Sequence, residues 1–90
     1  MSVRRTVAIT NRRGLHARAS AKFVTLASEL PCEVQVEKDG GDAVAGTSIM
    51  GLMMLGAAMG DSITISAEGD GAEDAVGRLA ALVEAKFGED

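Results

Sequence analysis

The sequence predicts an α+β fold in which helices cover one face of an antiparallel sheet. Four segments alternate apolar and polar residues, which is typical of strands that bury one face and expose the other. Three further segments place apolar residues at spacings of three and four, which predicts amphipathic helices. The segments follow the order βαββαβα. In a chain of 90 residues this order predicts one domain, over residues 1–90, built as a two-layer sandwich.

The N-terminal part of the chain predicts one strand and one long helix. Apolar and polar residues alternate over 3–9, and the turn 11–14 ends this strand. Gly14 can adopt a positive φ there, which allows a sharp change of direction. Helical spacing of apolar residues then predicts a helix from Ala17 to Ser28, and Pro31 just beyond it is a stop signal.

The middle of the chain predicts a hairpin followed by a short helix. A second strand is expected over 32–37 and a short third strand over 43–45. The glycine-rich turn 39–42 between them is a strong hairpin signal. The next apolar segment predicts a helix over 49–55.

The C-terminal part predicts the last strand and the last helix. Residues 61–67 alternate again, and a glycine-rich break follows them. Asp70 and Glu73 have the spacing of a capping box, which predicts the start of a helix over 72–87. Gly77 lies inside this helix at a cost of about 1 kcal/mol relative to alanine. We interpret it as a point of close packing against the sheet.

The composition excludes several classes of protein. No apolar run approaches the roughly 18 residues that a membrane span needs. The N-terminus lacks the apolar stretch of a secretory signal peptide. The single cysteine, Cys32, excludes an internal disulfide and an all-cysteine zinc site. We therefore expect a cytoplasmic protein that contacts no membrane.

Charge is divided unevenly along the chain. Residues 1–28 contain six arginines and lysines and no acidic residue, whereas the remainder contains 3 basic and 13 acidic residues. The formal net charge of −4 conceals this division. A basic N-terminal third predicts one face that binds an anionic partner. Nucleic acid, an acidic protein surface and phosphate are all candidates at this point.

The only histidine, His16, lies where a loop is expected to become a helix. The unpaired N–H groups of the first helical turn, including those of Ala17 and Arg18, would point toward a group carried by the imidazole. The helix dipole disfavours a protonated ring at this position and favours an anion. Further positive charge is expected from Arg18, with Arg12, Arg13 or Lys22 as further candidates. The arrangement favours a neutral, nucleophilic imidazole and stabilises a phosphoryl group attached to it.

Other chemistries of histidine fit the sequence poorly. A metal site needs further ligands, and no second histidine, no cysteine and no carboxylate lies near His16 in the sequence. A serine triad needs an acid to orient the ring, and none lies nearby, although Ser20 and Ser28 share the helix. We therefore expect no metal and no cofactor, and we interpret the histidine itself as a covalent acceptor.

The second predicted helix, 49–55, is apolar on nearly every side. Thr47 or Ser48 can cap it, and the helix dipole would tolerate a phosphate on Ser48. A buried helix is the simplest interpretation. In a sandwich open on one side, however, one face of the helix can turn to the core through Ile49, Leu52 and Leu55. The opposite face would then form an adaptable apolar patch, typical of protein interfaces, from Met50, Met53 and Met54.

Three stretches resemble the HPr family, the histidine-containing phosphocarrier proteins of the bacterial phosphoenolpyruvate-dependent phosphotransferase system. They read GLHARA at 14–19, TSIMGLMMLG at 47–56 and ITISAEG at 63–69. The resemblance covers essentially the whole chain. It implies an open-faced sandwich whose antiparallel sheet has the order 1-4-2-3 and carries three helices on one face. We expect this domain to be a monomer.

The resemblance also implies roles for individual residues. His16 would accept a phosphoryl group at Nδ1 from phosphorylated enzyme I and donate it to a histidine of a IIA protein, while Arg18 steadies the phosphate. Ser48 matches the regulatory serine that HPr kinase/phosphorylase phosphorylates. The apolar docking patch beside the active site would comprise Ile49, Met50, Met53 and Met54. The protein would thus be a covalent carrier and not an enzyme that turns over alone.

Two positions depart from the family pattern. Ala19 stands where the family usually has proline, a residue favoured in the first helical turn. We expect the helix to form with a less constrained start. Arg13 stands where the family often has a small polar residue, and it either adds charge to the phosphate site or points into solvent. Neither departure removes the nucleophile.

Two other functions are compatible with parts of the sequence. A regulatory adaptor would act mainly through phosphorylation of Ser48 and through partner binding. A small nucleic-acid-binding sandwich would use the basic N-terminal third. Neither Phe23 nor Phe87 lies on a predicted strand, so the sheet offers no aromatic ring on which a base could stack. We therefore expect protein partners and no nucleic acid.

Overall fold

A computed structural model describes residues 2–89 and has the predicted α+β fold. The chain forms β1, α1, β2, β3, α2, β4 and α3 in that order, and a 3₁₀ turn follows. The elements span Ser2–Ala8 (β1), Ala17–Ser28 (α1), Val34–Lys38 (β2), Val44–Ala45 (β3), Ile49–Met54 (α2), Ser62–Glu68 (β4), Ala72–Glu84 (α3) and Lys86–Gly88 (the 3₁₀ turn).

The four strands form one antiparallel sheet in the order β1-β4-β2-β3, which confirms the order that the family resemblance implies. Strand β4 is central. It pairs with β1 in a register that sets Val7 against Ile63, and with β2 in a register that sets Val36 against Ile65. Because β4 comes last of the four strands in the sequence, the sheet is completed only when this late segment inserts between two earlier ones.

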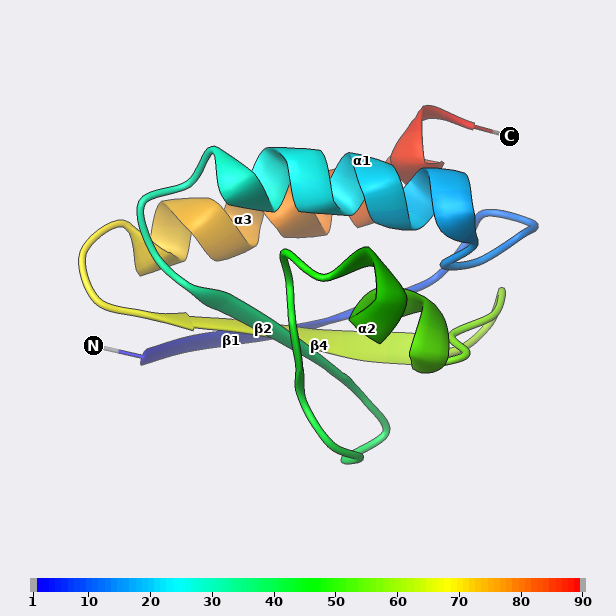
Figure 1. Cartoon of the computed structure of the whole chain (residues 1–90), viewed down its shortest axis with the longest axis horizontal. Coiled ribbons are helices and arrows are strands. Elements are labelled where there is room, and N and C mark those ends of the chain that lie inside the picture. Colours follow the sequence, from blue (N-terminus) through cyan, green and yellow to red (C-terminus); the bar gives the residue numbers. More distant parts are fainter. Residues whose placement is uncertain (1, 90) are drawn as a thin grey trace.

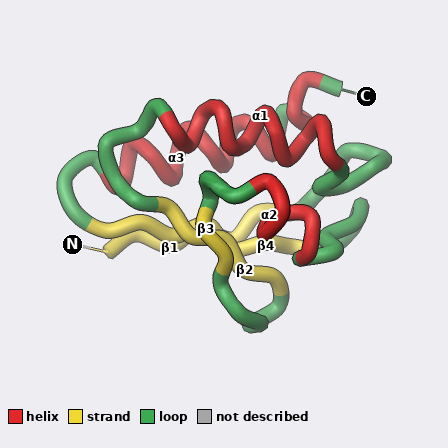
Figure 2. Tube along the Cα trace, in the orientation of Figure 1, coloured by secondary structure: helices red, strands yellow, loops and turns green. Residues whose placement is uncertain are grey.

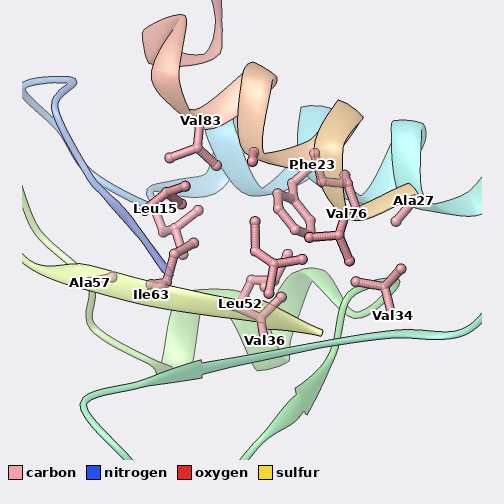
Figure 3. Packing of buried hydrophobic residues seen from close by; sticks show 14 of the residues in the cluster. Leu15, Phe23, Ala27, Val34, Val36, Leu52, Ala57, Ile63, Val76 and Val83 are labelled. Atoms are coloured by element: carbon pink, nitrogen blue, oxygen red, sulfur yellow. The ribbon is translucent and has the colours of Figure 1, made fainter. Parts of the chain in front are cut away.

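Helices α1 and α3 run side by side over one face of the sheet, and α2 packs beside them (Figures 1 and 2). The core lies between these helices and the sheet. Phe23 of α1, Val76 of α3 and Leu52 of α2 point toward one another there (Figure 3), and each is fully buried. The opposite face of the sheet carries polar side chains such as Arg4, Thr6 and Gln35. No helix within residues 2–89 is long and apolar enough to cross a membrane.

The last helix is shorter than the sequence predicts. Helix α3 ends at Glu84 instead of Phe87. Lys86 and Phe87 have φ values of 59° and 56°, the left-handed region, so the helix cannot continue through them. Phe87 nevertheless fits the apolar spacing because its ring turns back and is fully buried in the core.

The predicted capping box at the start of α3 is wrong. The N-cap residue is Gly71, and no side chain caps the helix. Glu73 and Asp74 lie in the first turn instead. Their negative charges stabilise the positive end of the helix dipole, so the acidic residues act through charge rather than through a reciprocal hydrogen bond.

Gly77 does not mark close packing against the sheet. A Cβ built on this residue has no neighbouring atom within 4 Å. We expect Gly77→Ala to stabilise the protein by roughly 0.5–1 kcal/mol, because alanine loses less backbone entropy in a helix. For a domain of this size the Tm should rise by about 3–6 °C in a thermal melt. An unchanged or lower Tm would contradict the conclusion that no neighbouring atom packs closely against Gly77.

Candidate functional site

One end of the molecule gathers four segments that are distant in sequence. The loop before α1, the start of α1, the loop between α2 and β4, and the C-terminal turn all lie at this end (Figure 1). Backbone hydrogen bonds join the two loops: Leu15 N–H donates to the Ala57 carbonyl at 2.9 Å, and Gly60 N–H donates to the Ile9 carbonyl at 2.9 Å. These bonds hold the loop that carries His16 against the loop between α2 and β4.

His16 is the N-cap residue of α1. Its backbone is extended, and its Nδ1 accepts a hydrogen bond from the backbone N–H of Arg18 at 3.3 Å. A ring nitrogen that accepts a hydrogen bond carries a lone pair and no proton. The lone pair of Nδ1 therefore points at the first turn of α1, where free N–H groups and the positive end of the helix dipole favour an anion.

The other ring nitrogen of His16 faces a carboxylate. Both carboxylate oxygens of Glu89 lie 3.0 Å from Nε2. Because Nδ1 accepts a hydrogen bond, the ring proton is on Nε2, and this N–H donates a hydrogen bond to Glu89. The two contacts together select the neutral tautomer that is protonated at Nε2. Sequence reasoning missed Glu89, since 73 positions separate it from His16.

Asn11, in the loop before α1, holds Glu89 in place. This fully buried side chain donates from Nδ2 to a Glu89 carboxylate oxygen and to the Gly14 carbonyl, each at 2.9 Å. The hydrogen bond from Asn11 and then the one from His16 hold the pKa of Glu89 below its ordinary value. Glu89 therefore stays ionised beside the imidazole across the neutral range.

The C-terminal turn brings Glu89 to this position. Lys22 on α1 donates from Nζ to the Phe87 carbonyl at 2.7 Å, and the Phe87 ring is buried in the core. These two contacts offset the left-handed conformations of Lys86 and Phe87, which cost on the order of 1–3 kcal/mol each. Lys22 thus holds the turn, and its charge also helps to lower the pKa of Glu89. Its role as a cation of the phosphate site stays a prediction.

Three arginines lie around a hollow beside Glu89, the carboxylate that His16 contacts. Arg12, Arg13 and Arg18 line an open hollow of about 380 Å³ together with Glu89. All three are exposed and make no ion pair with any residue from 2 to 89. Their charges are available to a ligand anion, and Arg13 belongs to this hollow. Within the same described residues no group of three His, Cys, Asp or Glu side chains could hold a metal ion.

Ser48, not Thr47, caps helix α2. Its Oγ accepts a hydrogen bond from the Gly51 N–H at 3.0 Å. Leu52 is the one fully buried residue of α2, and Leu55 just beyond it is half-buried. The expectation that Ile49 faces the core is wrong, since 41% of it is exposed. Leu52 is the buried side chain that anchors the short helix in the core. The remaining apolar side chains of α2 extend the exposed surface: Ile49, Met50, Met53 and Met54.

Comparison with known proteins decides which family combines these features. A sequence model of the family described as "PTS HPr component phosphorylation site" matches residues 3–85. The chain belongs to the HPr family. This is a family of phosphocarrier proteins of the phosphotransferase system, and it implies enzyme I and IIA proteins as partners.

Individual HPr-family proteins are similar over nearly the whole chain. The phosphocarrier protein HPr of Pseudomonas aeruginosa is 41% identical over 83 residues, 92% of each chain. The phosphocarrier protein NPr of Shewanella violacea is 42% identical over 85 residues, 94% of this chain and 92% of the relative. A crystal structure of HPr-C-His from Thermoanaerobacter tengcongensis superposes with a TM-score of 0.90 at 45% identity and covers 98% of both chains.

The departure at Ala19 leaves the HPr fold intact here. Helix α1 begins at Ala17, as predicted, and Ala19 is fully buried in the core. Ala17 itself is exposed at the first turn beside His16. The first turn is held by the His16 cap and by the hydroxyl of Ser20, which donates to the Leu15 carbonyl at 3.1 Å. These contacts constrain the start of the helix without proline.

The contact between Glu89 and His16 predicts a pH-dependent stability. Glu89→Gln keeps an oxygen acceptor and removes the charge. Because the folded protein lowers the pKa of Glu89, the charged carboxylate stabilises the wild type relative to this variant. This stability advantage of the wild type should be complete above pH 4.5, the ordinary pKa of the Glu89 carboxyl group. It should disappear as the pH falls through the lowered pKa of the folded protein.

Thermal melts of both proteins across this pH range measure the effect. The Tm of the wild type should exceed that of the variant at neutral pH, and the two values should converge in acid. A Tm difference that is the same at every pH would contradict a charge-dependent contact.

Proposed function

We propose that this HPr-family protein carries a phosphoryl group on His16 Nδ1, accepts it from phosphorylated enzyme I and passes it to a IIA protein. The observation that carries the proposal is the orientation of the imidazole. The lone pair of Nδ1 faces the N-terminus of α1, and the proton on Nε2 faces the Glu89 carboxylate. The nucleophilic nitrogen is thus the one beside the anion-binding groups.

Transfer requires a change of bonding at one atom. The lone pair of Nδ1 attacks phosphorus while the bond between phosphorus and the donor nitrogen breaks. The proton stays on Nε2, so the phosphorylated ring carries positive charge that the Glu89 carboxylate stabilises. The phosphoryl oxygens replace the Nδ1 lone pair as acceptors for the Arg18 N–H, and the guanidinium of Arg18 steadies their charge, with Arg13 in support.

The open position of the site supports a carrier and not an enzyme that turns over alone. The hollow beside Glu89, which contacts His16, is bounded by exposed arginines, and no lid within residues 2–89 covers it. A donor and an acceptor protein can each reach the same nitrogen in turn. A shallow site with modest stabilisation returns the phosphoryl group readily, as phosphoryl transfer in both directions requires.

Labelling with phosphoenolpyruvate and enzyme I tests the proposal. We expect intact mass spectrometry to detect one added phosphoryl group, and we expect brief acid treatment to remove it, as for a phosphohistidine. Addition of a IIA protein should transfer the group. A chain that gains no phosphoryl group, or gains one that survives acid, would refute the carrier function.

Ser48 supports a second, regulatory part of the proposal, in which HPr kinase/phosphorylase phosphorylates this serine. The hydroxyl caps α2 and is only half-buried, beside the docking patch formed by Ile49, Met50, Met53 and Met54. A phosphate there would add about −1.5 to −2 charges to this apolar surface. In the alternative function, a regulatory adaptor, this phosphorylation and partner binding are the main activity and transfer through His16 is secondary.

Ser48→Asp measures the effect of charge at this position. Aspartate and asparagine both cap helices well, so Ser48→Asn is a matched neutral control that keeps the cap. We expect Ser48→Asp to weaken docking to an acidic surface on enzyme I by about 1 kcal/mol, which corresponds to about a fivefold higher KM in phosphoryl transfer. Equal transfer kinetics for wild type, Ser48→Asp and Ser48→Asn would exclude control by charge at Ser48.

We further propose that the protein acts as a cytoplasmic monomer. The arginine-lined hollow beside Glu89 and the docking patch are both accessible in a single chain. Sedimentation velocity at the concentrations used for the transfer assay checks the oligomeric state, and a dimer at those concentrations would contradict this part of the proposal.

A further inference from the structure

The methionines within residues 2–89 lie on the surface of the protein and not in its core. Met50, Met53, Met54 and Met59 are 69%, 41%, 81% and 58% exposed. Buried apolar positions in residues 2–89 are filled by alanine, valine, isoleucine, leucine and phenylalanine instead. Every thioether of the described chain is therefore accessible to small oxidants in solution.

Three of these methionines share one short helix. Met50, Met53 and Met54 lie on α2 at positions i, i+3 and i+4, a spacing that sets side chains on adjacent parts of a helix surface. We call these three residues the methionine surface. They also make up most of the docking patch. Met59 follows in the loop between α2 and β4, outside that patch.

The fold does not depend on the methionine surface. Helix α2 is fixed by the fully buried Leu52 and by the Ser48 cap on the Gly51 N–H. Oxidation of a methionine converts a flexible apolar side chain into a polar sulfoxide and can be reversed by methionine sulfoxide reductases. At these positions the change alters what a partner contacts and leaves the core unchanged.

We propose that the methionine surface is a reversible oxidation site that controls docking of phosphorylated enzyme I beside His16. Hydrogen peroxide transfers one oxygen atom to each sulfur. The sulfur loses two electrons and becomes a sulfoxide, and the peroxide is reduced to water. A dithiol-dependent reductase returns the sulfoxide to the thioether, and its dithiol becomes a disulfide as water is released. The inference rests on the proposed function for the identity of the partner.

The size of the effect follows from the area involved. A methionine that packs in an interface contributes through removal of its apolar surface from water, and a sulfoxide loses most of this contribution. Loss at three neighbouring positions should raise the KM for phosphorylated enzyme I by at least about tenfold. The kcat should change less, because His16 and Arg18 are not modified.

The experiment compares oxidised and reduced protein in a Cys32→Ala background, which removes the single thiol. The protein is treated with hydrogen peroxide, catalase then removes the oxidant, and peptide mass spectrometry locates the sulfoxides. Circular dichroism checks the fold before phosphoryl transfer is measured over a range of enzyme I concentrations. We expect a raised KM with the fold retained, and recovery of the KM after treatment with methionine sulfoxide reductase and dithiothreitol.

Two variants assign the effect to particular sulfurs. The triple variant Met50→Leu, Met53→Leu, Met54→Leu keeps an apolar surface that peroxide cannot oxidise, so its own KM should be the same before and after treatment. Met59→Leu removes only the sulfur outside the patch, and peroxide should raise its KM as in the parent.

Three results would overturn the inference. They are an unchanged KM when all three sulfoxides are present, an equal rise in KM for the triple variant, and loss of folded structure on oxidation. Failure of the untreated protein to accept a phosphoryl group would refute the proposed function itself. Normal transfer before oxidation with no change afterwards refutes only the role of the methionine surface.

Discussion

The variant His16→Asn should accept no phosphoryl group from phosphorylated enzyme I while it keeps the fold of the wild type. Asparagine has no nucleophilic ring nitrogen, so it cannot form the bond to phosphorus. It is also among the best N-cap residues, and its side-chain oxygen can accept the hydrogen bond that Nδ1 now accepts from the Arg18 N–H. The substitution therefore separates chemistry from helix capping.

His16→Ala is the matched control for the cap. Alanine removes both the nucleophile and the capping acceptor, so this variant should be less stable than His16→Asn by about 1 kcal/mol. Intact mass after labelling reports the phosphoryl group, and thermal melts report stability. An acid-labile phosphoryl group on His16→Asn would show that another residue is the acceptor.

Gly14→Ala should destabilise the protein by about 3 kcal/mol and disrupt the His16 loop. Gly14 has a φ of +63°, which costs alanine about 1–2 kcal/mol. A Cβ at this position would lie 2.4 Å from the Ala57 carbonyl oxygen and 2.8 Å from the Ala58 Cα. Both atoms belong to the backbone, so the two loops must separate, and the hydrogen bond from the Leu15 N–H to Ala57 is strained or lost.

Gly56→Ala distinguishes the two causes. Gly56 has a similar φ of +65°, but a Cβ there meets no atom within 4 Å. We expect this variant to show only the cost of the left-handed backbone. Gly14→Ala should lower the Tm by at least about 10 °C and slow phosphoryl acceptance, whereas Gly56→Ala should lower the Tm by about half as much. Similar Tm values for the two variants would mean that the contact with Ala57 contributes nothing.

Features that depend on local periodicity were predictable from the sequence. Helix α1 begins at Ala17 and ends at Ser28 as predicted, because its stripe of apolar residues is followed closely by Pro31. The four strands likewise follow the alternation of apolar and polar residues, to within a few residues at their ends. Helix α3 begins at Ala72 as predicted, but its predicted end was wrong, since Phe87 shares the apolar spacing of a helix although it lies in a left-handed turn. The spacing of apolar residues indicates which residues are buried. A buried residue such as Phe87 need not belong to the helix that precedes it.

In the candidate site, too, some features could be predicted from the sequence and others depend on the tertiary structure. The sequence by itself determined that His16 opens a helix, that Arg18 follows in its first turn and that Thr47 or Ser48 caps the next helix, because capping and the helix dipole act over three or four residues. Only the tertiary structure decided that Glu89 meets the Nε2 of His16, that Asn11 holds Glu89, and that Lys22 binds the Phe87 carbonyl. These contacts join residues 65 or more positions apart. They form because the insertion of β4 between β1 and β2, with α3 packed over the sheet, brings the C-terminal turn back to the start of α1, and no local pattern encodes that return.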